Sequence, residues 1–84
     1  MRTIFCGNLN YMLTDAELRA AFEPYGRVVD ARIITDRFTG DSKGFGFVEM
    51  GSDEEAQKAM TALDGSRLMG RTLRCNSASP REGR

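Results

Sequence analysis

Hydrophobic and polar residues recur along the chain with two different periods. Strand patterns, in which side chains alternate or β-branched residues dominate, cover residues 3–8, 28–34, 43–50 and 68–76. Apolar residues at helical spacing fill the interval after the first strand and the interval after the third. The expected order is therefore strand, helix, strand, strand, helix, strand.

Each predicted helix begins with a capping box, in which two side chains satisfy backbone N–H groups at the start of the helix. Thr14 and Glu17 form the first box, and Ser52 and Glu55 form the second. The residues expected to face the core from the two helices are Leu18, Ala21, Phe22, Ala56, Ala59, Met60 and Leu63. Both helices are therefore amphipathic and pack on one side only.

This order predicts an α+β fold of the ferredoxin-like split βαβ type (βαββαβ). In this arrangement two helices cover one face of a four-stranded antiparallel sheet. The other face of the sheet is then open to water. Residues 1–78 are expected to form this single domain, and residues 79–84, which are polar, are expected to form a flexible tail.

Three phenylalanines fall on the predicted open face. Phe5 alternates with Ile4 and Cys6, which face the core, and Phe45 and Phe47 alternate with smaller residues. A single exposed phenylalanine is ordinary on a protein surface. Three on one sheet face indicate a surface that binds something.

These residues carry a resemblance to a known family, the RNA recognition motif. The sequence IFCGNL at residues 4–9 resembles its hexapeptide motif. The sequence KGFGFVEM at residues 43–50 resembles its octapeptide motif, with Met50 in place of a final aromatic residue that would face the core. The whole pattern is most similar to the small standalone RNA-binding proteins of bacteria, of the cyanobacterial type.

The resemblance implies binding of single-stranded RNA by base stacking on the open face, without catalysis. Phe5 and Phe47 would each stack a base, Phe45 would pack on the sugars, and Lys43 would pair with a phosphate. Single-stranded DNA offers similar chemistry and stays open as a ligand. The residues expected to bond base edges, because they share this face by alternation, are Arg32, Glu49, Arg74 and Asn76.

The composition argues against catalysis and against a bound metal. The 84 residues include no histidine, which is the commonest general base and a common metal ligand. The two cysteines, Cys6 and Cys75, cannot complete a zinc site and are expected to be reduced core residues. We therefore expect no cofactor. No apolar run is long enough to span a membrane. A cytoplasmic bacterial monomer is expected, or a nuclear location in a eukaryote.

The charge balance first argues against nucleic acid, because 12 basic and 12 acidic residues give a net charge of zero. The distribution changes this interpretation. Residues 14–24 and 52–64, the helical segments, hold seven acidic and two basic residues, and the rest of the chain holds ten basic and five acidic residues. A chain that is acidic on its helices and basic around its sheet would attract phosphates to one face, with moderate affinity.

Other functions stay open. The same fold could serve as a protein–protein interaction module. Acylphosphatases share the architecture, but residues 7–12 do not match their phosphate-binding loop, so catalysis is not expected. Lys43 and Arg74 could be plain solubilising charges. Tyr11 and Phe38 lie in loops, where each could contact RNA or simply cap the sheet edge.

Overall fold

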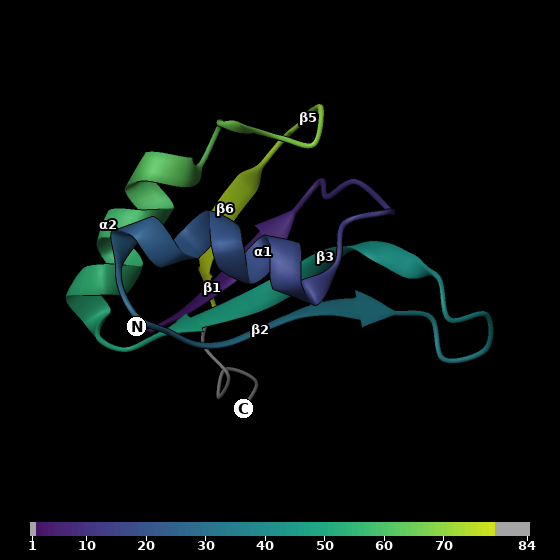
Figure 1. The fold of residues 1–84 in the computed structure, drawn as a ribbon, viewed down its shortest axis with the longest axis horizontal. Coiled ribbons are helices and arrows are strands. Elements are labelled where there is room, and N and C mark those ends of the chain that lie inside the picture. The colour runs from purple at the N-terminus through teal and green to yellow at the C-terminus, as the bar shows by residue number, and fades with distance from the viewer. Residues whose placement is uncertain (1, 79–84) are drawn as a thin grey trace.

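A computed structural model describes residues 2–78, and the predicted tail at residues 79–84 lies outside this part. Figure 1 shows the succession of helices and strands. They are β1 (Thr3–Gly7), α1 (Asp15–Phe22), the 3₁₀ turn η1 (Glu23–Tyr25), β2 (Val28–Thr35), β3 (Ser42–Met50), α2 (Asp53–Leu63), β4 (Arg67–Leu68), β5 (Arg71–Thr72) and β6 (Arg74–Ala78). Within the described residues, no helix is both long and apolar enough to cross a membrane.

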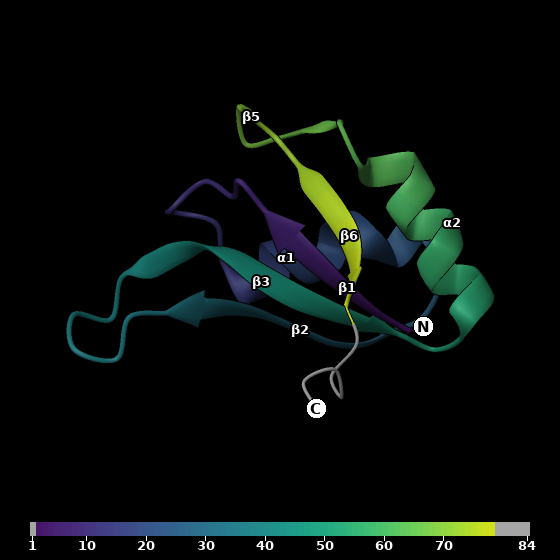
Figure 2. The same ribbon diagram turned by 180° about the vertical axis from the view of Figure 1, so that it is seen from behind.

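The main sheet has four antiparallel strands in the order β2-β3-β1-β6. Seen from one side, α1 lies in front of the sheet and α2 beside it (Figure 1). Seen from behind, the strands of the sheet lie in front of α1 (Figure 2). The predicted α+β fold, with one covered and one open sheet face, is confirmed.

The two helix starts differ in their capping. At α1 both bonds of the predicted box form: Glu17 N donates to Thr14 Oγ1 at 3.1 Å, and Thr14 N donates to Glu17 Oε1 at 3.0 Å. At α2 only half of the box forms, because Glu55 N donates to Ser52 Oγ at 3.2 Å without the return bond. The Glu55 side chain instead packs beside Gly26, where a Cβ would approach it within 2.7 Å. The second capping box was therefore predicted only half correctly.

The core lies between the covered sheet face and the two helices. Cys6 and Cys75, opposite each other on β1 and β6, are both buried free thiols, as predicted. A hydrogen bond to Cys75, together with burial, raises the pKa of the Cys6 thiol. The buried residues are Ile4, Cys6, Leu9, Leu13, Leu18, Phe22, Val28, Ala31, Val48, Met50, Ala56, Ala59, Leu73 and Cys75.

The end of the chain departs from the prediction of one strand over residues 68–76. The short strands β4 and β5 pair as a separate hairpin, and β6 begins only at Arg74. The chain reverses at Met69 and Gly70, whose φ angles of 51° and 82° are both left-handed, as tight hairpin turns require. Alternation continues on both sides of this turn, so the pattern of side chains alone does not reveal the reversal.

Glycine lets β2 and β3 approach each other closely. Gly46 is buried, and a Cβ at this position would collide with the backbone carbonyl oxygen of Arg32 on β2. The alternation of residues 43–50 predicts that Gly46 lies on the covered face of the sheet, away from the aromatic side chains, and the structure shows this. Contact between two backbones, which the sequence does not reveal, is what excludes a larger residue.

Candidate nucleic-acid interface

The three phenylalanines of the open face form one group of contacting rings, here called the phenylalanine cluster (Phe5, Phe45 and Phe47). The ring centroid of Phe5 lies 5.8 Å from the centroid of Phe45 and 5.8 Å from that of Phe47. The centroids of Phe45 and Phe47 are 6.3 Å apart. These separations are within the range of favourable aromatic contacts. All three side chains are only partly buried. The rings therefore support one another while part of each stays accessible.

The register of the central strands brings the cluster together. Phe5 on β1 lies opposite Phe47 on β3, and Phe45 is two residues away on the same strand. The neighbouring pair, Ile4 and Val48, points to the other face and is fully buried. Because side chains alternate along a strand, one register both fills the core and builds the cluster.

Phe5 and Phe47 occupy the middle of a line of four side chains across the sheet, here called the central row. Arg32 on β2 lies opposite Phe47, and Asn76 on β6 lies opposite Phe5. Arg32 and Asn76 are both exposed. The central row therefore has an aromatic pair in its middle and a polar side chain at each end.

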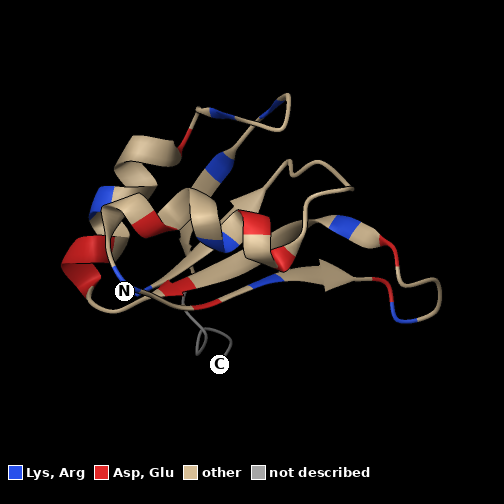
Figure 3. Ribbon diagram, viewed as in Figure 1, with Lys and Arg blue, Asp and Glu red and all other residues tan. Residues whose placement is uncertain are grey.

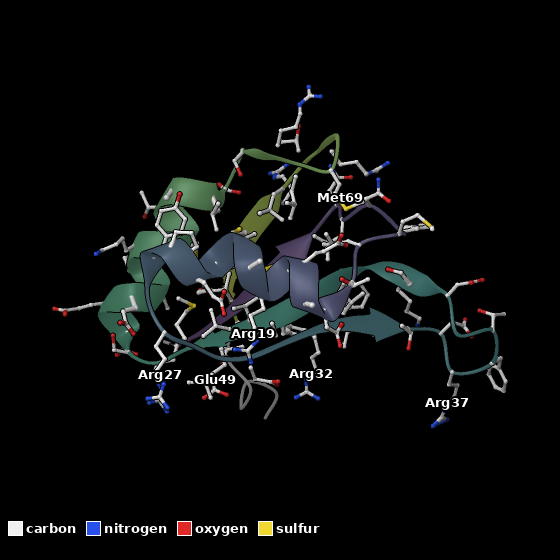
Figure 4. All side chains as sticks on the ribbon, viewed as in Figure 1. Arg19, Arg27, Arg32, Arg37, Glu49 and Met69 are labelled. Atoms are coloured by element: carbon white, nitrogen blue, oxygen red, sulfur yellow. The ribbon has the colours of Figure 1, made fainter. Side chains whose placement is uncertain are left out.

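A second line of residues carries carboxylates. Glu49 lies opposite Asp30 on β2 and approaches Arg2 to 4.0 Å, and Asp30 approaches Arg32 to 3.3 Å. Figure 4 labels Glu49 and Arg32 on their strands. Exposed ion pairs of this kind contribute less than about 1 kcal/mol each. The open face is thus less basic than the charge distribution along the sequence predicts.

The two remaining basic candidates lie toward the end of the sheet where β1 finishes. Arg74 lies opposite Gly7, and its Nε is 4.0 Å from a carboxylate oxygen of Asp64. Lys43 is exposed at the start of β3. Gly44, which follows it, has a φ of 83°, so strict alternation does not extend to Lys43. Figure 3 shows basic positions on the strands and acidic positions at the start of α2.

The β2–β3 loop is held in a compact turn by one carboxylate. Asp36 accepts hydrogen bonds from the N–H groups of Phe38 at 2.8 Å and Thr39 at 3.2 Å, which lower the pKa of Asp36. This turn displays Arg37, labelled in Figure 4, and the exposed ring of Phe38. Phe38 takes no part in the ring contacts of the phenylalanine cluster.

Two glycines near the cluster, Gly7 and Gly44, have structural roles that the sequence did not assign. A Cβ at Gly7 would lie 3.0 Å from Cε2 of Phe5, so this glycine lets the Phe5 ring lie against the strand. Tyr11 covers Gly44, where a Cβ would lie 2.9 Å from its ring, although most of Tyr11 is exposed. The sequence signal for the role of Gly7 is its position two residues after an outward-facing aromatic residue.

Known proteins resemble this chain over nearly its whole length. Residues 4–74 match the RNA recognition motif family. The protein RbpA of Nostoc sp. is 51% identical over 82 residues, which cover 98% of this chain and 80% of RbpA. The resemblance to proteins of the cyanobacterial type is thereby confirmed.

Two solved structures share the fold. The second RRM domain of the yeast poly(U)-binding protein Pub1 superposes with a TM-score of 0.88 at 38% identity, covering 94% of this chain and 95% of that domain. A chain of the Sxl-lethal protein/RNA complex gives a TM-score of 0.85 at 33% identity, covering 92% of this chain and 47% of that one.

The contact between Gly7 and Phe5 predicts the effect of Gly7→Ala. The added methyl should push the Phe5 ring away from the strand and change the NMR shifts of the Phe5 and Phe45 ring protons. The free energy of unfolding should change by less than about 1 kcal/mol, because a movable side chain meets the methyl. Unchanged ring shifts would contradict this arrangement of the cluster.

The matched control is Gly46→Ala, where the added methyl meets backbone. This variant should lose about 1–3 kcal/mol of stability, measured by urea denaturation.

Proposed function

The chain belongs to the RNA recognition motif family, and we propose that it binds single-stranded RNA on the open face of its sheet. The observation that carries the proposal is the phenylalanine cluster at the centre of that face, with a polar residue at each end of its row. The names of the two similar structures support RNA as the class of ligand, since one is a poly(U)-binding protein and the other an RNA complex.

The orientation of the rings favours an unstacked, single-stranded ligand. The planes of Phe5 and Phe47 are inclined to each other by 65°. Two bases that lie flat on these rings cannot remain stacked on each other or stay in a duplex. Phe5 and Phe47 would each hold one base, with a contribution of about 1–3 kcal/mol per base, and Phe45 would pack on the sugars between them.

The ends of the central row offer hydrogen bonds to the two bases. The Asn76 amide can both donate and accept, and it lies beside the base that stacks on Phe5. Arg32 lies beside the base on Phe47 and offers only hydrogen-bond donors. Glu49, two residues after Phe47 on β3, offers only acceptors. Stacking tolerates every base, so selectivity would come from these polar groups.

Lys43 and Arg74 are the proposed phosphate contacts. The ion pair of Arg74 with Asp64 is long and exposed, so a phosphate can replace the carboxylate at little cost. Because the open face also holds Asp30 and Glu49, the affinity should be moderate. The proposal involves no catalytic step. Three further points stay predictions: that the protein is a monomer, that it is cytoplasmic and that it also binds single-stranded DNA.

Alanine substitutions test stacking directly. Phe5→Ala and Phe47→Ala should each weaken binding of a short single-stranded RNA by about 5- to 150-fold, the equivalent of one lost stacking contact. Fluorescence anisotropy with a labelled RNA gives the affinity, and circular dichroism verifies the fold. Phe38→Ala removes an equally large but isolated ring and is the matched control, expected to leave the affinity within about twofold of the original. A folded Phe47→Ala protein with unchanged RNA affinity would contradict stacking on this face and favour the alternative, a protein–protein interaction module.

The number of phosphate contacts predicts the salt dependence. If two or three phosphates are neutralised, log K should fall against log salt with a slope of about −1.4 to −2.1, or about 7- to 18-fold between 50 and 200 mM. Replacing Lys43 and Arg74 by alanine together should make the slope shallower by about 1.4. A slope that the double substitution leaves unchanged would remove these two residues from the phosphate contacts.

A further inference from the structure

Two cysteines lie opposite each other on neighbouring strands at one edge of the sheet. Cys6 on β1 pairs with Cys75 on β6, and both are free thiols buried on the covered face. β6 is the last strand in the order of the sheet and lies beside β1 (Figure 2). The candidate nucleic-acid interface is on the open face, so these two thiols are separate from it.

The hydrogen bonds of β6 determine what kind of pair the cysteines form. The N–H group of Cys75 donates to Asp64 Oδ1 at 2.9 Å and is therefore not used for β1. In an antiparallel ladder, two opposite residues either exchange both backbone hydrogen bonds or exchange none. Cys6 and Cys75 are thus a non-hydrogen-bonded pair, in which the Cα atoms lie about 4.5 Å apart and the side chains are closer together.

This arrangement suits a disulfide bond. A disulfide requires a Cα separation of about 4.4–6.8 Å, and a non-hydrogen-bonded pair falls within this range. The two thiols already share a hydrogen bond. A competing acceptor for the Cys6 thiol, the carbonyl oxygen of Ile4, is 3.9 Å away. A bond between the two sulfur atoms therefore requires only small movements of the side chains.

The two thiols differ in access and in acidity. Cys75 keeps 4% of its surface exposed, whereas Cys6 keeps none. The hydrogen bond from Cys6 lowers the pKa of Cys75, and the same bond, together with burial, raises the pKa of Cys6. The thiolate is the reactive form of cysteine, and local opening of an outer strand admits a reagent. Cys75 is therefore the thiol that meets an oxidant first.

We propose that Cys6 and Cys75 are a redox site, whose disulfide fastens β6 to β1 on the covered face. The oxidant is a small disulfide such as oxidised glutathione. The Cys75 thiolate attacks one of its sulfur atoms, which forms a mixed disulfide and releases one glutathione. Cys6 then loses its proton, attacks the Cys75 sulfur and releases the second glutathione. The two protein thiols are oxidised, and their protons and electrons end on two glutathione thiols.

The crosslink stabilises the folded domain at the strand that carries Asn76. Cys6 and Cys75 lie near the two ends of the domain, so the disulfide closes most of the chain into one loop. Long loops give the largest reduction in the entropy of the unfolded chain. Asn76 follows Cys75 and lies opposite Phe5, so oxidation also fixes this end of the central row. Neither effect requires RNA.

Equilibration of the purified chain with reduced and oxidised glutathione tests the redox site. Acid quenching, alkylation of free thiols and mass spectrometry of peptides give the fraction in which Cys6 is joined to Cys75. The equilibrium constant for this disulfide should be at least about tenfold larger in native buffer than in urea, because the fold holds the thiols together. For the same reason, the oxidised protein should melt at least about 5 °C above the reduced protein.

A displaced thiol provides the matched control. In the double variant Cys75→Val and Ser77→Cys, the second thiol moves two residues along β6, to the position opposite Ile4. Diagonal neighbours of this kind are about 7–8 Å apart, beyond the reach of a disulfide. The preference for the disulfide in native buffer should therefore disappear. Cys6→Val, which keeps Cys75, should form only a mixed disulfide with glutathione.

Several results would overturn the redox site. These are equal equilibrium constants in native buffer and urea, crosslinks between two chains in place of the internal disulfide, or an oxidised protein that melts no higher than the reduced one. An equally favourable disulfide in the displaced-thiol variant would also overturn it, because the opposite placement of Cys6 and Cys75 would then have no effect. All of these results would leave the proposed function standing, because no RNA enters the measurement.

Discussion

The pairing of β1 with β3 determines both the packing of the core and the make-up of the open face. In this register, Ile4 and Val48 meet in the core, and Phe5 and Phe47 meet on the open face. A slip of one residue would exchange the two faces of one strand, which would bury an aromatic ring where the helices pack and expose a core residue. Stability and the candidate site therefore depend on the same set of backbone hydrogen bonds.

The cluster is a compromise between folding and binding. Three partly exposed phenylalanines leave apolar area in contact with water, which favours a ligand that covers them. Their contacts with one another fix the rings before any ligand arrives, so little side-chain entropy is lost on binding. Exposed ion pairs at the rim, such as that between Arg32 and Asp30, hold polar groups near the site and break readily.

Local patterns in the sequence predicted much of this structure, and contacts between distant residues account for what was missed. The order of the elements and the box at Thr14 follow from short-range chemistry, and alternation placed Phe5 and Phe47 on the open face. The reversal at Met69 was missed because alternation looks the same on both sides of a tight turn. The bond between Arg71 and Asn8 spans 63 residues, so no local pattern predicts it. The sum of charges by segment hides the carboxylates of the open face, because Asp30 and Glu49 belong to the part of the chain that is basic overall.

Stacking of RNA bases on Phe5 and Phe47 is open to direct observation. Intermolecular nuclear Overhauser effects between isotope-labelled protein and a short unlabelled RNA report which protons of the two molecules lie close together. The structure predicts contacts from base protons to the rings of Phe5 and Phe47 and from ribose protons to Phe45. Contacts confined to α1 and α2, or RNA-induced shifts that leave the open face unchanged, would contradict it.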